Sequence, residues 1–133
     1  MAPVVPTVTA AYAALLGLLA AALTVRVILN RVKTGIQAGD GGNAGLAQAI
    51  RAHANLAEQV PLALLLMALS EAVGTPAAVV HALGAGLVVA RLASAWGLSH
   101  SLGPTTPRQA GAGLTVLVVT AASLLIAYRL GVA

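Results

Sequence analysis

The chain has 133 residues, of which 59% are hydrophobic and 8% charged, and its formal net charge is +4. A soluble domain usually carries about 25% charged residues, so this composition indicates a membrane protein with little mass outside the bilayer. The lack of cysteine excludes disulfides, thiolate metal ligands and a cysteine nucleophile, while the scattered basic residues and 2% aromatic content argue against nucleic-acid binding.

Four apolar segments are long enough to cross a membrane as helices. They cover residues 8–29, 48–70, 77–98 and 110–130. Each has roughly 21 to 23 residues, which at 1.5 Å per residue spans a hydrocarbon core of about 30 Å. None alternates polar with apolar side chains, so membrane β-strands are disfavoured. We therefore predict an all-α membrane protein, a four-transmembrane-helix bundle that forms one domain over residues 1–133.

The first segment is interpreted as a retained helix and not as a signal peptide, because no positively charged stretch precedes it. Arginine and lysine concentrate around the connections at residues 33–45 and 99–107, whereas the connection at 71–76 has neither. The positive-inside rule then places the first and third connections in the cytoplasm and both termini outside. The residues that produce this bias are Arg26, Arg31, Lys33, Arg51 and Arg108.

Arg51, Asn55 and Glu58 lie at positions i, i+4 and i+7 of the second segment. At about 100° per residue they fall within roughly 60° of one another, so this helix is predicted to present a polar stripe near its cytoplasmic end. Two interpretations fit the stripe: a ligand site, or a polar network that holds helices together. His53 points to nearly the opposite face, where a packing or interfacial role is commoner than ligand binding.

Arg91 lies in the middle of the third segment, far in sequence from any acidic residue. Because an unpaired charge in lipid is costly, we expect Glu58 to contact Arg91 or another arginine within a span. Arg26 is near an end of the first segment, where its side chain can extend to the headgroups. Small residues at four-residue spacing permit close helix approach. They include Ala13, Gly17 and Ala21 on the first segment, and Gly84 with Val88 on the third.

The stretch RAHANLAEQVP at residues 51–61 resembles the signature R-x-H/Q-x-N-x-x-E-x-x-P of the MAPEG family, the membrane-associated proteins in eicosanoid and glutathione metabolism. The resemblance covers nearly the whole chain, with four spans of matching length, ARL at 90–92 on the third span and an arginine before the fourth. It implies a homotrimer of four-helix protomers, with glutathione between neighbouring subunits near the cytoplasmic side. The GDGG loop and LTVLVV at 114–119 look most like the bacterial branch, which implies a bacterial inner membrane.

The resemblance also implies roles for individual side chains. Ser94 and Leu98 stand where eicosanoid-forming members place tyrosines, and Ala54 stands where some members have a basic residue. These departures remove hydrogen-bonding partners for glutathione. The family's glutathione contacts fall on Arg51, Asn55, Glu58 and Arg91, and the arginine that activates the thiol falls on Arg108 or Arg31.

The function expected from this resemblance is that of a membrane glutathione transferase or peroxidase acting on lipophilic electrophiles. Its partners would be other copies of the chain, membrane lipids and a lipophilic substrate that enters from the bilayer. The alternative is a non-catalytic membrane protein of the same fold, in which the polar stripe serves trimer assembly or binds an anionic lipid. A small transporter is a weaker interpretation, because the segments show no broken-helix signal.

Overall fold

The computed structural model describes residues 5–132, and this part of the chain forms four α-helices and no β-strand. All four helices are long and apolar enough to cross a membrane, so the predicted all-α, four-span fold is confirmed. The predicted domain also includes residues 1–4 and 133, which lie outside the described part. The helices are α1 (Thr7–Thr34), α2 (Ala44–Ala72), α3 (Ala77–His100) and α4 (Thr106–Arg129).

The helices are longer than a hydrocarbon core requires. With 28 and 29 residues, α1 and α2 measure about 42 to 44 Å at 1.5 Å per residue, against a core of about 30 Å. Their polar turns therefore extend past the bilayer at the end that holds the first connection. α4 begins before the predicted residue 110, because Pro107 is favourable in a first turn, where its missing N–H has no intrahelical acceptor.

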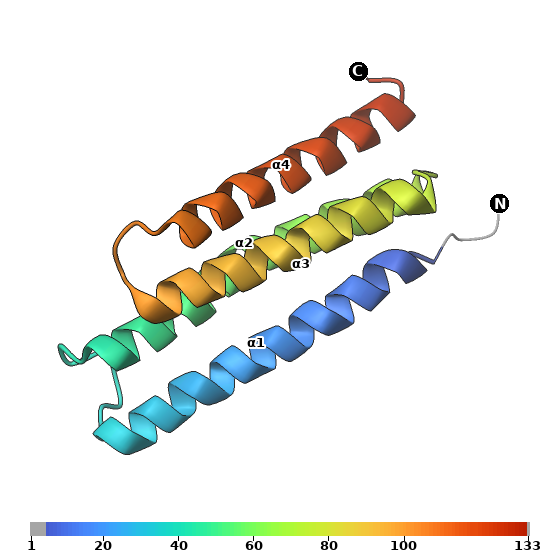
Figure 1. Ribbon diagram of the computed structural model, residues 1–133. Helices are drawn as coiled ribbons and strands as arrows, with labels where there is room; N and C mark the ends of the chain where they lie inside the picture. The colour runs from blue at the N-terminus through green and yellow to red at the C-terminus, as the bar shows by residue number, and fades with distance from the viewer. Residues whose placement is uncertain (1–4, 133) are drawn as a thin grey trace.

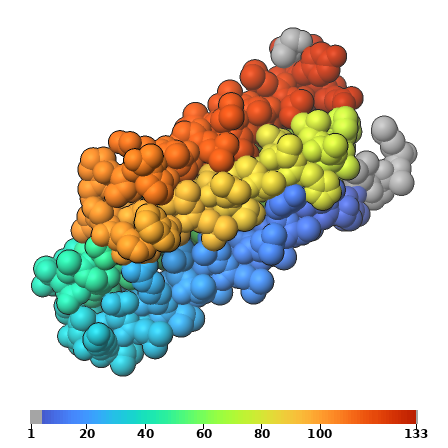
Figure 2. Space-filling view, in the orientation of Figure 1, coloured from blue at the N-terminus to red at the C-terminus, as the bar shows by residue number. Residues whose placement is uncertain are grey.

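The four helices run alternately up and down the bundle (Figure 1). The beginning of α1 and the end of α4 lie at one end, and the connections between α1 and α2 and between α3 and α4 lie at the other. α2 and α3 form the centre and each packs against all the other helices, whereas α1 and α4 do not pack against each other within residues 5–132. Figure 2 shows the surface of this arrangement, with α3 separating α1 from α4 on the visible face.

The buried core receives side chains from every helix. Leu16 of α1, Met67 of α2, Leu87 of α3 and Val118 of α4 are all buried there. Many large apolar side chains point outward instead, among them Leu18, which suits a bundle whose surroundings are lipid tails. The interior is therefore a narrow seam between helices, and polar groups within it are energetically important.

A carboxylate from α2 caps the beginning of α1. The first turn of α1 has no acidic residue and no capping side chain of its own. Glu71, in the last turn of α2, accepts hydrogen bonds from the backbone N–H groups of Val8 at 2.9 Å and Thr9 at 2.8 Å, and from the Thr9 hydroxyl at 2.7 Å. These bonds satisfy free N–H groups and place a negative charge at the positive end of the helix dipole.

Two further contacts hold α1 against α3. The Tyr12 ring lies over Gly84, where an added Cβ would be 2.2 Å from Tyr12 Cδ2, and its hydroxyl is 3.0 Å from His81 Nδ1. The prediction that Gly84 permits close helix approach is therefore confirmed. Near the other end, Arg26 was expected to extend to the headgroups but instead donates a hydrogen bond to Ser99 Oγ of α3.

Candidate functional site: a polar stripe on α2 and a buried arginine

The predicted stripe on α2 carries an ion pair. Arg51 Nη1 lies 3.6 Å from Glu58 Oε1, and the two side chains are 44% and 55% exposed. The helix brings them together because they are separated by seven residues, or two turns. An exposed pair at this distance is weakly held, so both groups remain available to a charged ligand or to a neighbouring protein chain.

Asn55 lies one turn after Arg51 on the same helix and is half-buried. Its Oδ1 atom accepts a hydrogen bond of 3.0 Å from Arg91 Nη1 on α3. Within residues 5–132 its Nδ2 group has no hydrogen-bond partner. The bond from Arg91 therefore fixes the orientation of the amide and leaves two N–H donors for another molecule.

Arg91 is 2% exposed and joins three helices. Besides Asn55 on α2, its Nη2 atom donates to Ser94 Oγ at 3.2 Å, to the Gly111 carbonyl at 3.0 Å and to Thr115 Oγ1. The bonds to Gly111 and Thr115 reach α4. Such burial indicates that this guanidinium braces the bundle and positions Asn55.

The prediction that Glu58 contacts Arg91 or another arginine within a span is confirmed, but the arginine is Arg51 and not Arg91. Asn55 is the residue of the stripe that lies nearest α3, whereas Glu58 is on the exposed side of α2. Neutral oxygens from α3 and α4 supply the other acceptors for Arg91. The two Nη atoms thus obtain their hydrogen bonds without a carboxylate, while Nε is buried and has no partner within residues 5–132.

Sequence reasoning missed the contribution of α4 to this cluster. At Gly111 an added Cβ would lie 2.3 Å from Ser94 Oγ and 2.5 Å from the Ala90 carbonyl oxygen. Only glycine allows α3 and α4 to approach this closely, which brings the Gly111 carbonyl and Thr115 hydroxyl within reach of Arg91. The sequence feature that could have indicated this contribution is the pair Gly111 and Thr115, a glycine and a threonine four residues apart in an apolar segment.

The two arginines predicted to activate a thiol donate hydrogen bonds to backbone carbonyls of the connections between helices. Arg31 Nη1 donates to the carbonyls of Ile36 at 3.1 Å and Gly39 at 3.0 Å. Arg108 Nη1 donates to the carbonyl of Leu102 at 2.9 Å, and more weakly at 3.3 Å to the next carbonyl. Both lie at the same end of the bundle as the stripe. No hydrogen bond or ion pair within residues 5–132 joins either arginine to the stripe.

Comparison with known proteins identifies the family. The MAPEG family matches residues 9–128. The inner membrane protein YecN of Escherichia coli (strain K12) is 37% identical over 95 residues, which cover 71% of this chain and 72% of YecN. YecN of Escherichia coli O6:H1 matches to the same extent. With its four membrane-spanning helices and the RAHANLAEQVP signature on α2, this chain belongs to the MAPEG family of membrane proteins.

Proposed function

We propose that this protein is a glutathione-dependent transferase or peroxidase of the inner membrane that acts on lipophilic electrophiles. The observation on which the proposal rests is the arrangement of the stripe. A half-exposed Arg51–Glu58 pair flanks Asn55, whose amide is fixed by the buried Arg91. This arrangement offers a cation, an anion and an oriented amide on one accessible helix face.

The charges of glutathione fit these side chains. The tripeptide carries two carboxylates and one ammonium group at neutral pH. Arg51 can pair with a carboxylate through two parallel hydrogen bonds, and Glu58 can pair with the ammonium group. Breaking the exposed Arg51–Glu58 pair costs no more than about 1 kcal/mol. Asn55 would donate to the peptide, while Arg91 is a positioning residue, because its side chain is buried and already bonded.

Glutathione bound here would supply a thiol, whose thiolate form attacks an electrophilic carbon or reduces a peroxide. A free thiol has a pKa near 8.5, and a guanidinium within reach favours the thiolate. Lowering that pKa by about two units requires roughly 2.7 kcal/mol. Arg108 and Arg31 each use Nη1 for loop carbonyls and retain Nε and Nη2 for a sulfur. The connection bonded to each arginine would then set the position of the guanidinium that activates the thiol.

We further propose a homotrimer with its first and third connections in the cytoplasm. On α2 the exposed side chains of Leu62, Leu65 and Leu69 continue the face that begins with Arg51 and Glu58. Their spacing of three and four residues suits a helix–helix interface. The basic residues around the two connections support the orientation, and the name of YecN supports the inner-membrane location. The lipophilic substrate would enter from the bilayer.

One observation favours the alternative, a non-catalytic protein of the same fold. The arginines near the stripe are engaged by the protein itself: Arg26 binds Ser99, Arg31 and Arg108 bind loop carbonyls, and Arg91 is buried. In this alternative the polar stripe serves trimer assembly or binds an anionic lipid.

Calorimetric titration of glutathione into the protein in lipid nanodiscs tests the proposal. Wild type should bind glutathione, and Arg51→Ala should weaken binding about tenfold, because a charge-assisted hydrogen bond is lost. Lys33→Ala, which removes an exposed cation at the same end of the bundle, should bind like wild type. The alternative is supported if wild type binds no glutathione at millimolar concentration and native mass spectrometry shows that Arg51→Ala loses the trimer.

A further inference from the structure

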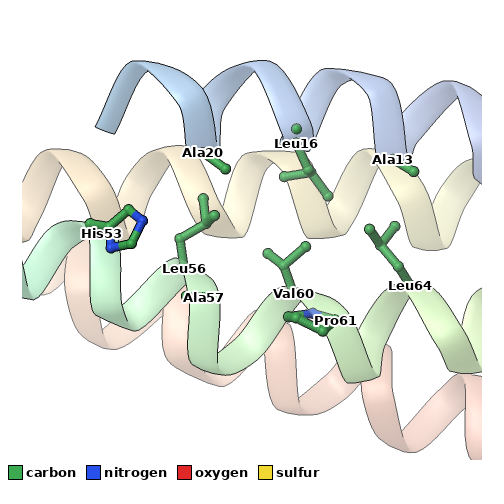
Figure 3. A pocket seen from close by; sticks show the side chains of 10 residues that line it. Ala13, Leu16, Ala20, His53, Leu56, Ala57, Val60, Pro61 and Leu64 are labelled. Carbon is green, nitrogen blue, oxygen red and sulfur yellow. The ribbon is translucent and has the colours of Figure 1, made fainter. Parts of the chain in front are cut away.

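A groove of about 200 Å³ lies between α1 and α2, on a different side of α2 from the stripe. Leu16 and Ala20 of α1 face Leu56, Val60 and Leu64 of α2 across it (Figure 3). It runs along two turns of α1, where the small residues Ala13 and Gly17 leave room. An added Cβ at Gly17 would meet nothing within 4 Å, so the groove is open at that point.

Two polar groups interrupt this apolar lining. The first is the His53 ring, which lies at one end of the groove and has no hydrogen-bond partner among residues 5–132 (Figure 3). The second is the carbonyl of Ala57. Its usual intrahelical donor would be the N–H of residue 61, but Pro61 has none. Ala57 and Pro61 both line the groove, so a carbonyl that lacks its usual intrahelical donor lies one helical turn along α2 from the histidine.

The position of the groove in the membrane matches a lipid chain. His53 follows the charged Arg51 by two residues, which places it near the bilayer surface. From there to Leu64 the groove extends about 16 Å at 1.5 Å per residue. That is about half of a hydrocarbon core of about 30 Å, or the depth of one leaflet. A single apolar chain from that leaflet would run from His53 towards Leu64.

We propose that this groove binds a single-chain membrane lipophile bearing a hydroxyl group. The hydroxyl donates its proton to the Ala57 carbonyl and accepts a hydrogen bond from the His53 ring, while the chain covers Leu56, Val60 and Leu64. His53 has no hydrogen-bond partner among residues 5–132, and the Ala57 carbonyl lacks its usual donor. Both groups belong to a membrane-spanning segment, where unsatisfied polar groups are costly. A plain hydrocarbon would leave both unsatisfied. The proposal is independent of glutathione and of the stripe.

Photolabelling in phosphatidylcholine nanodiscs tests this binding. The probes are a long-chain primary alcohol carrying a diazirine in its chain, and the methyl ether of the same alcohol, which cannot donate a hydrogen bond. Mass spectrometry of peptides should locate the alcohol on residues 56–64, with labelling about fivefold above that of the ether, the preference expected for one net hydrogen bond.

Three variants in the groove and one control variant examine the parts of the site. Gly17→Leu should abolish labelling by filling the groove, whereas Gly113→Leu, the same change at an open and exposed position of α4, should leave labelling unchanged. Pro61→Ala restores the donor to Ala57 and should reduce labelling by the alcohol to the level of the ether. His53→Phe keeps a ring of similar shape and should have the same effect.

Two results would overturn the proposal. Equal labelling by alcohol and ether means that the groove takes ordinary acyl chains without recognising a hydroxyl. Absence of labelling in wild type, together with loss of the oligomer in Gly17→Leu but not in Gly113→Leu, means that a second copy of the chain fills the groove.

Discussion

Arg91 of α3 donates a hydrogen bond of 3.0 Å to Asn55 Oδ1 of α2 and thereby joins a buried cation to the polar face that carries Arg51 and Glu58. The remaining acceptors of Arg91 come from α3 and α4. The interior of the bundle and the candidate site are thus one hydrogen-bonded system. A change at Arg91 should therefore affect both the stability of the bundle and the orientation of Asn55.

The first prediction concerns the partner of Arg91. In a double-mutant cycle, Asn55→Ala and Arg91→Met should couple by about 1.5 to 3 kcal/mol in the free energy of unfolding. Either substitution alone already removes the hydrogen bond to the charged group, so the double variant loses nothing more from it. Reversible unfolding in mixed micelles measures this coupling. The control cycle of Glu58→Ala with Arg91→Met should be additive within about 0.5 kcal/mol. Coupling in the control cycle, without coupling in the first cycle, would instead indicate that Arg91 pairs with Glu58.

The second prediction concerns the cap on α1. Glu71→Ala should lower the free energy of unfolding by about 1 to 2 kcal/mol, because the N–H groups of Val8 and Thr9 lose their acceptor and the helix dipole loses its anion. Hydrogen exchange at those two amides should accelerate. Glu58→Ala removes an exposed carboxylate from the same helix and should leave the two amides unchanged. Unaltered exchange in Glu71→Ala would show that the cap does not stabilise α1.

The third prediction concerns the contact between α1 and α3. Gly84→Ala places a Cβ 2.2 Å from Tyr12 Cδ2 and should cost about 1 to 3 kcal/mol through overpacking. Gly113→Ala, where nothing lies within 4 Å, should instead be neutral or slightly stabilising, as expected for alanine in an open helix. Thermal unfolding compares the two. In a Tyr12→Ala background the cost at Gly84 should disappear, and its persistence would place the strain elsewhere.

The fourth prediction separates the two roles of Arg108. If Arg108 activates the thiol, Arg108→Ala should leave glutathione binding nearly normal and reduce the ultraviolet absorbance of the thiolate and the conjugation of a model electrophile. If it only holds the connection after α3, the variant should accelerate hydrogen exchange in residues 101–105 without changing the thiolate signal. Arg108→Lys keeps the charge but not the paired geometry, and should retain part of the thiolate signal.

The sequence by itself determined the local properties of this chain. The four spans follow from the lengths of the apolar runs, because every helix must satisfy its own backbone in lipid. The stripe follows from the helical repeat, which places Arg51, Asn55 and Glu58 on one face whatever surrounds them. The family also follows from this stretch, because its charged and amide residues are rare within a span.

Only the tertiary structure decided which groups meet across helices. Arg91 binds Asn55 and not Glu58, because the packing of α3 places it beside the half-buried amide and the close approach at Gly111 supplies neutral oxygens. Glu71 caps a helix that begins 64 positions earlier in the chain. Likewise, His53 was predicted to lie away from the stripe, but its place at the end of a groove depends on α1. Such contacts depend on how the helices pack, which the spacing of residues within one helix does not specify.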